Sequence, residues 1–146
     1  VAGSNTHQFY TFTGNFPTEL RVEAYVPDYV DAGDSRPVIS GAPDTVALGK
    51  DFTVQVTLNN GDEITAGTVA VNLISSPFTT HSYSQGLRFL KLEVKAVAKA
   101  DGNGNTYNVA VTAPPGGTVA PPAYYMLWVV NGGIPCTKAS WVQITY

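Results

Sequence analysis

Apolar and polar residues alternate along several short stretches of this chain, a pattern typical of strands that bury one side of a sheet. In residues 51–58, a threonine or a glutamine separates each apolar side chain from the next. Residues 87–98 also fit helical spacing, but we expect a strand there. Runs rich in Asp, Asn, Gly and Pro lie between these stretches and favour turns. Strands are predicted over residues 19–25, 51–58, 68–75, 87–98, 105–112, 124–131 and 140–146.

About seven strands in one chain predict an all-β, immunoglobulin-like β-sandwich. The length of 146 residues is that of one domain of ordinary size. Hydrophobic residues make up 44% of the chain and charged residues only 13%, so a core can form without disulfides or a structural metal.

The charge distribution argues against two classes of partner. The formal charge of −3 comes from 11 acidic and 8 basic residues that are scattered along the chain. No cluster of Lys and Arg could neutralise successive phosphates, so nucleic acid is not expected as a partner. No apolar run approaches the roughly 20 residues that cross a bilayer, so no membrane partner is expected either.

The first 18 residues differ from the rest of the chain in their pattern of apolar and polar residues. They are polar and aromatic without regular alternation, and they precede the first predicted strand. The chain starts at Val1 with neither an initiator Met nor the features of a signal peptide. We interpret residues 1–18 as part of something upstream, and the start as a processed or truncated end.

The two histidines, His7 and His81, are the first candidates for a metal ligand or a proton carrier. His81 follows the apolar run at residues 69–74 and precedes the next predicted strand. A loop held at both ends could present its imidazole to a site. From the residues alone, a histidine that only hydrogen-bonds within its own turn remains the alternative.

Other chemistry has weaker support in the sequence. There is no GxSxG motif, and Ser82 and Ser84 lack the context of a catalytic nucleophile. The acidic residues between positions 19 and 34 are expected to be solvated surface charge rather than a glycosidase pair. Residues 101–105, DGNGN, begin like a calcium loop but lack its closing Glu, so a hairpin turn is expected there.

Aromatic residues in the stretch PPAYYMLWVVN could either stack on sugars or pack in the core. Tyr124 and Trp128 would share one face of a strand and Tyr125 the other. The stretch is the most hydrophobic of the chain, which favours a central strand with packed aromatics. An exposed aromatic stripe would instead favour a carbohydrate-binding module.

Four strings of the chain together resemble the C-terminal end of glyoxal oxidase-like and galactose oxidase-like copper-radical oxidases, particularly the plant branch. These strings are GSNTHQFYTFTGNFPTELRVEAYVPDYVD, RPVI, SPFTTHSYSQGLRFLKLEV and PPAYYMLWVVNGGIP. The resemblance implies an immunoglobulin-like early set domain that follows a seven-bladed propeller. Residues 1–18 would then be a remnant of the last propeller strand and its linker, and residues 19–146 the early set domain.

The resemblance also assigns a role to His81. In the family, two tyrosines and two histidines bind copper, and one tyrosine is crosslinked to a cysteine. The early set domain contributes one histidine, within a T-H-S/T motif that matches Thr80, His81 and Ser82. Arg88 matches a family arginine that we expect to anchor the base of this loop. Leu87 stands where the family usually has glutamine.

The resemblance implies that this chain is one part of an enzyme. His81 alone would leave most coordination positions of a copper ion to water. Cys136, the only cysteine, occupies a late loop and is interpreted as a structural or incidental thiol. The isolated chain is therefore expected to be inactive and metal-free. The full enzyme would be a secreted oxidase that converts aldehydes or alcohols and reduces O2 to H2O2.

A stand-alone defence or carbohydrate-binding sandwich module, without enzyme activity, is the alternative to the oxidase domain. Such a module would keep the sandwich and lack the propeller.

Overall fold

The computed structural model describes residues 2–100 and 104–146. The chain forms two compact units, Val1–Asp31 and Ala32–Tyr146. The 3-10 helix η1 (Asp28–Ser35) contains the boundary between the units. The turn predicted at residues 101–105 falls largely on residues 101–103, outside the described residues. The division of the chain after residue 18 stays a prediction.

In the first unit, the strand predicted over residues 19–25 is wrong. Among the described residues of this unit, only one isolated bridge forms, between Val22 and Ala2. Beside it, the Gly3 N–H donates to the Arg21 carbonyl and the Glu19 N–H to the Ser4 carbonyl. The alternating apolar side chains Leu20 and Val22 are 63% and 78% exposed. Alternation that has no facing layer to pack against cannot stabilise a strand.

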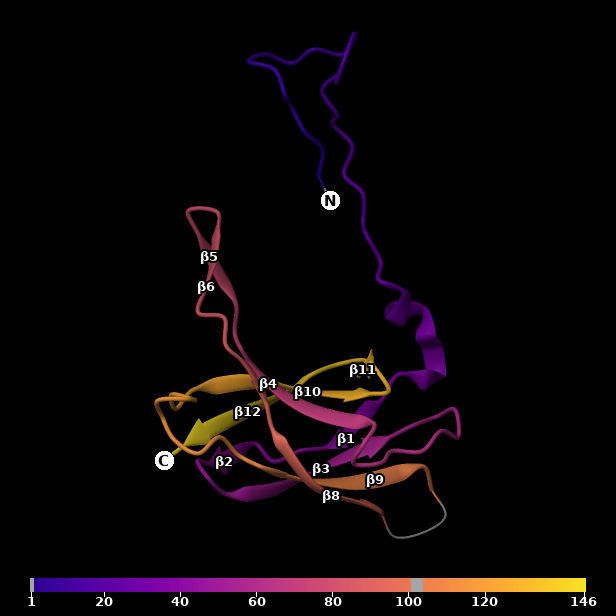
Figure 1. The fold of residues 1–146 in the computed structure, drawn as a ribbon, viewed down its shortest axis with the longest axis vertical. Helices are drawn as coiled ribbons and strands as arrows, with labels where there is room; N and C mark the ends of the chain where they lie inside the picture. The colour runs from indigo at the N-terminus through magenta and orange to yellow at the C-terminus, as the bar shows by residue number, and fades with distance from the viewer. Residues whose placement is uncertain (1, 101–103) are drawn as a thin grey trace. The chain divides into compact units, whose positions relative to one another are not determined.

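The second unit is a sandwich of two sheets, with a small hairpin that extends beyond it (Figure 1). The first sheet has the order β1 (Val38–Gly41), β3 (Asp51–Thr57), β9 (Thr106–Thr112) and β8 (Glu93–Lys99). The second sheet has the order β2 (Thr45–Ala47), β12 (Ser140–Thr145), β10 (Tyr124–Asn131), β4 (Val69–Ser75) and β7 (Phe89–Lys91), with β11 (Ile134–Pro135) beside β10. The hairpin consists of β5 (Phe78–Thr80) and β6 (Tyr83–Gln85).

The all-β sandwich predicted from the sequence is confirmed, with ten described strands in its two sheets where about seven were predicted, and two more in the hairpin. Six strands, β1, β2, β5, β6, β7 and β11, are two to four residues long. All of these except β7 lie outside the predicted stretches, because they are too short for alternation to reveal them. The strand predicted over residues 87–98 is two strands in different sheets, because the chain crosses between the sheets at Leu92. This leucine is buried, and its N–H donates to the carbonyl of Val71.

Valine and leucine side chains from both sheets form one core between them. In β3, Val54 and Val56 are fully buried while Thr53 and Gln55 are exposed, which confirms the alternation read from the sequence. On the opposite sheet, Leu127 of β10 is fully buried as well. Within the described ranges, no helix has the length and the apolar character needed to cross a bilayer.

Replacing Leu127 by alanine is expected to lower the free energy of unfolding by about 2–5 kcal/mol, because the change leaves a cavity in the core. The matched control is Leu87→Ala, since Leu87 is 59% exposed and its truncation should change stability by less than about 0.5 kcal/mol. Urea unfolding followed by tryptophan fluorescence measures both. Equal midpoints for the two variants would contradict the placement of this core.

Candidate functional site

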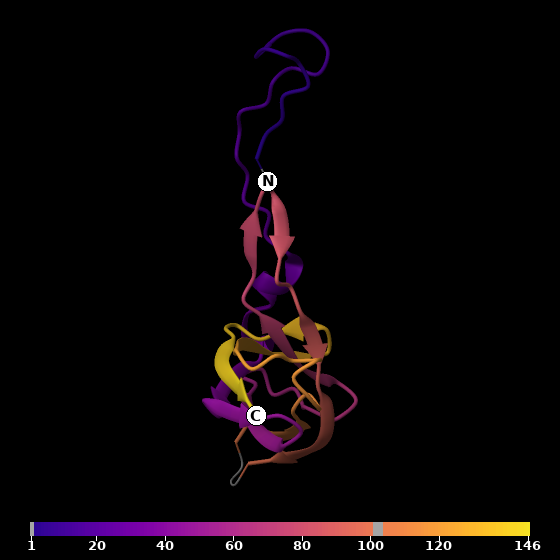
Figure 2. The same cartoon turned by 90° about the vertical axis from the view of Figure 1, so that its left-hand side faces the viewer.

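The hairpin β5–β6 rises from the sandwich where β4 ends and returns the chain to β7 (Figures 1 and 2). Its cross-strand pairs are Phe78 with Gln85, Thr79 with Ser84, and Thr80 with Tyr83. This register leaves His81 and Ser82 as the two residues of the turn. His81, the histidine singled out in the sequence, is therefore at the tip of the hairpin, and its side chain is exposed.

The turn at the tip has an uncommon backbone conformation for its residues. The φ angle is +53° at His81 and +64° at Ser82. Two consecutive positive φ angles characterise the type I′ turn, which normally holds Asn-Gly and fits the twist of a two-residue hairpin. A residue other than glycine in this region costs of order 1–3 kcal/mol, and such strain is concentrated at functional sites.

The base of the hairpin is fixed by hydrogen bonds. The Ser75 hydroxyl donates to the carbonyl of Gly86, and the Arg88 N–H donates to the Ser75 Oγ at 2.7 Å. The Arg88 guanidinium donates to the carbonyl oxygens of Thr118, at 3.2 Å, and Val119. Arg88 thus joins the second leg of the hairpin to the loop before β10.

Leu87, which stands at the position of the family glutamine, contributes no polar side chain to this base. Its side chain is exposed. The hydrogen bonds at the base come from Ser75, Gly86 and Arg88 instead. The leucine therefore does not interrupt the contacts that hold the hairpin.

His7, the other histidine, belongs to the first unit, where its Nε2 is 3.0 Å from the Phe16 carbonyl oxygen. No group of three or more His, Cys, Asp or Glu side chains that could hold a metal exists among the described residues.

Two carboxylates, those of Glu19 and Asp51, belong to surface ion pairs. Hydrogen bonds from Arg21, 2.6 Å away, lower the pKa of Glu19 to about 2. A hydrogen bond from Thr112 and the ammonium of Lys95, at 3.2 Å, lower the pKa of Asp51. Both carboxylates are held in the charged form, which is the wrong state for a general acid at neutral pH.

Cys136 is enclosed in the core. Its Sγ accepts from the Val129 N–H at 3.4 Å and lies 3.4 Å from the Lys138 carbonyl oxygen. Burial raises the pKa of the thiol above its ordinary value. A buried, protonated thiol is a poor nucleophile and a poor metal ligand, in keeping with a structural role.

The aromatic residues of β10 divide between the core and the surface. Tyr125 is buried, and its hydroxyl donates to the Pro121 carbonyl at 2.9 Å. Tyr124 is 60% exposed, so the expectation that it packs in the core is wrong. It lies on the outer face of the sheet, the face opposite to buried Tyr125 and Leu127.

An apolar row crosses the outer face of the same sheet. The register places one residue from each of four neighbouring strands side by side. We name these four residues the outer row: Phe89, Ile74, Met126 and Trp141. The aromatic side chains at its two ends, Phe89 and Trp141, are 65% and 54% exposed. Large exposed apolar patches on a soluble domain commonly mark a contact surface.

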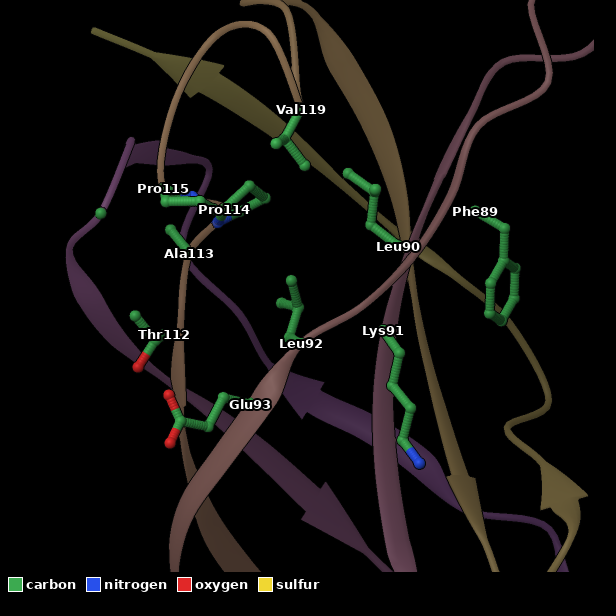
Figure 3. A pocket seen from close by; sticks show the side chains of 11 residues that line it. Phe89, Leu90, Lys91, Leu92, Glu93, Thr112, Ala113, Pro114, Pro115 and Val119 are labelled. Carbon is green, nitrogen blue, oxygen red and sulfur yellow. The ribbon is translucent and has the colours of Figure 1, made fainter.

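A cleft of about 570 Å³ opens between the β7–β8 crossover and the loop after β9 (Figure 3). Its walls are mainly apolar, with Leu90, Leu92 and Val119 among them. The ionisable residues that line it are Lys91 and Glu93, and Figure 3 shows the Lys91 side chain directed away from Glu93. The cleft could hold an apolar group, but its lining offers neither a metal-binding cluster nor a matched acid and base.

The sandwich unit matches a known family of domains. A family model described as "Galactose oxidase-like, Early set domain" matches residues 36–144. The chain belongs to this family. The domain predicted from the four strings of sequence is thereby confirmed.

Three plant proteins align with 99% of the chain: "Aldehyde oxidase GLOX" of Vitis pseudoreticulata at 48% identity, "Putative aldehyde oxidase Art an 7" of Artemisia annua at 41%, and "Aldehyde oxidase GLOX1" of Arabidopsis thaliana at 36%. The chain spans only 27%, 24% and 23% of their lengths. A solved structure, "Novel fungal alcohol oxidase with catalytic diversity among the AA5 family, in complex with copper", matches 76% of this chain and 21% of its own, at 28% identity and a TM-score of 0.55. The three plant relatives are thus about four times as long as this chain.

Replacing Ser82 by glycine is expected to stabilise the hairpin by roughly 0.5–1 kcal/mol, because glycine adopts positive φ without a steric penalty. Amide hydrogen exchange in β5 and β6 should slow by a few fold. The control is Ser84→Gly, in the extended strand β6, where the same substitution should accelerate exchange. Faster exchange in Ser82→Gly would show that the turn is not held at positive φ.

Proposed function

We propose that this chain is the C-terminal part of a secreted copper-radical oxidase, to which it supplies His81 as one copper ligand. The full enzyme would oxidise aldehydes or alcohols and reduce O2 to H2O2, and the early set domain would not be catalytic alone. The observation that carries the proposal is the exposed histidine at the tip of a hairpin that projects from the sandwich. Secretion rests on the family resemblance alone.

The residues of the hairpin suit one ligand of a shared copper site. Imidazole nitrogen is a good ligand for copper, and the His81 imidazole is exposed. Among the described residues, no group of three or more His, Cys, Asp or Glu side chains could hold a metal. The remaining ligands would come from the other three quarters of the enzyme, whose length the relatives indicate. A copper ion beside a tyrosyl radical would supply two one-electron acceptors, as the oxidation of an alcohol or an aldehyde requires.

The chain's own contribution would be to place the imidazole and to exclude water around it. The exposed Phe78 and Tyr83 rings on the hairpin, 54% and 74% exposed here, would be covered inside a partner. Exclusion of water strengthens electrostatic interactions at a reacting centre and protects reactive intermediates. Thr80 and Ser82 would support His81 as its neighbours, and Arg88 through the hairpin base.

The partner we propose is an upstream seven-bladed propeller of the same polypeptide, to which residues 1–18 would belong. Figures 1 and 2 show the hairpin rising from the side of the sandwich formed by the sheet of β10, away from the sheet of β3. The outer row lies on the outer face of that sheet. A body that receives the hairpin would therefore also cover the outer row.

A second candidate function, a carbohydrate-binding module without enzyme activity, draws support from the exposed aromatic rings. Tyr124 and Trp141 lie on one outer sheet face and are 60% and 54% exposed. Flat aromatic faces of this kind can stack on sugars. The variants described next separate this function from contact with a propeller.

In the full-length enzyme, His81→Ala is expected to reduce copper content and to lower peroxide production by at least about 100-fold, because the copper site loses a ligand that the rest of the enzyme cannot replace. Elemental analysis and a coupled peroxide assay with aldehydes and alcohols measure the two effects. His7→Ala is the control, since His7 lies in the other unit. A His81→Ala enzyme that keeps its copper and activity would refute the proposed role.

Replacing Phe89 and Trp141 together by serine is expected to lower the Tm of the full-length enzyme by several degrees, since it removes apolar area from the proposed contact. The 146-residue chain should show little change, because both side chains are already exposed in it. Calorimetry of both forms measures this, with Thr53→Ala on the opposite sheet as control. If the full enzyme is unaffected while binding of the chain to insoluble polysaccharide is lost, the carbohydrate-binding function is favoured instead.

A further inference from the structure

A side-chain hydrogen bond crosses the hairpin directly below its turn. The Gln85 Nε2 donates to the Thr80 Oγ1 at 2.7 Å. Thr80 pairs with Tyr83 and Gln85 with Phe78, so Gln85 reaches Thr80 diagonally, from two residue pairs below. Thr80 is the residue before His81. The bond therefore connects the second strand of the hairpin to the residue that leads into the turn.

The turn needs such a connection because neither of its residues favours the conformation it has. His81 and Ser82 both have positive φ, in a position where Asn-Gly would close the turn by itself. All six residues of β5 and β6 are exposed, so no core lies beneath them. Isolated two-stranded hairpins are at best marginally stable in water. Among the described side-chain hydrogen bonds of this hairpin, the one from Gln85 is the nearest to the turn.

A second contact, between the Phe78 ring and the Gly86 backbone, lies next to Gln85 on the hairpin. Gly86 follows Gln85 with a φ of +67°, and a Cβ at this position would overlap the ring of Phe78. The Phe78 ring thus lies against the Gly86 backbone, and Phe78 is also the cross-strand partner of Gln85. Because side chains alternate along a strand, Phe78, Thr80, Tyr83 and Gln85 share one face of the hairpin.

We propose that Gln85 is a positioning residue for His81. Through its hydrogen bond to Thr80, Gln85 holds the turn in the conformation that would direct the His81 imidazole toward the copper. This inference rests on the proposed function. It gives a role to a residue that neither the motif around His81 nor the predicted supporting positions include. Gln85 itself does not touch the metal, and its effect should be seen in the geometry of the turn.

The first test uses the metal-free 146-residue chain. In Gln85→Leu, the three-bond HN–Hα couplings of His81 and Ser82 should move toward averaged values, and the amides of the hairpin should exchange about fivefold faster, the effect of one hydrogen bond. Gln85→Glu should restore the parent behaviour, because the Thr80 hydroxyl can donate to its carboxylate. Ser84→Ala, on the opposite face of β6, is the matched control. Unchanged couplings and exchange rates in Gln85→Leu would overturn the proposal.

The second test uses the copper-loaded full-length enzyme. Gln85→Leu should shift or broaden the copper(II) hyperfine pattern in electron paramagnetic resonance, and Gln85→Glu should restore it. A parent-like spectrum in Gln85→Leu, together with loss of copper in His81→Ala, would overturn the positioning role alone. Retention of copper in His81→Ala would instead show that the proposed function has failed. The two failures are thereby distinguishable.

Discussion

The antiparallel pairing of β4 with β10 supports both the core and the hairpin. Seven consecutive pairs join the two strands, from Val69 opposite Asn131 to Ser75 opposite Tyr125. Along β4, Val71 and Leu73 point into the core and are fully buried. The hairpin begins directly after Ser75. A slip of one residue in this pairing would exchange the two faces of β4 and carry the hairpin with it.

The same strand therefore links the packing of the domain to the position of His81. Ser75, the last residue of β4, accepts from the N–H of Arg88 and donates to the carbonyl of Gly86. These bonds close the base of the hairpin on a strand that the core holds rigidly. A histidine on a free loop would lose conformational entropy when it binds a metal. A short hairpin on a central strand has lost most of that freedom on folding.

The sequence was sufficient for the fold class, and it drew attention to His81, but it did not reveal the hairpin on which this histidine lies. Alternation in residues 51–58 identified β3 because its two faces differ sharply in exposure. The hairpin stayed hidden, since β5 and β6 have only three residues each and the turn lacks the Asn-Gly signal. The crossover at Leu92 was missed because apolar and charged residues alternate without interruption from Leu90 to Ala96, as they would in one continuous strand. The contact from Gln85 to Thr80 depends on register, which no local pattern specifies.

Two kinds of exposed surface lie on one side of this sandwich, and they have different physical causes. The outer row is apolar on a sheet face where an ordinary solvated sheet would have polar residues. The outer face of the β3 sheet follows that ordinary rule, since Thr53 and Gln55 are exposed there. The hairpin, by contrast, is exposed because it leaves the sandwich altogether. One contact surface would account for the exposure of both the outer row and the hairpin, because a partner that accepts the hairpin would approach from the side of the outer row. The site at His81 and the stability of the interface would then depend on the same docking event, so a loss of either would weaken the other.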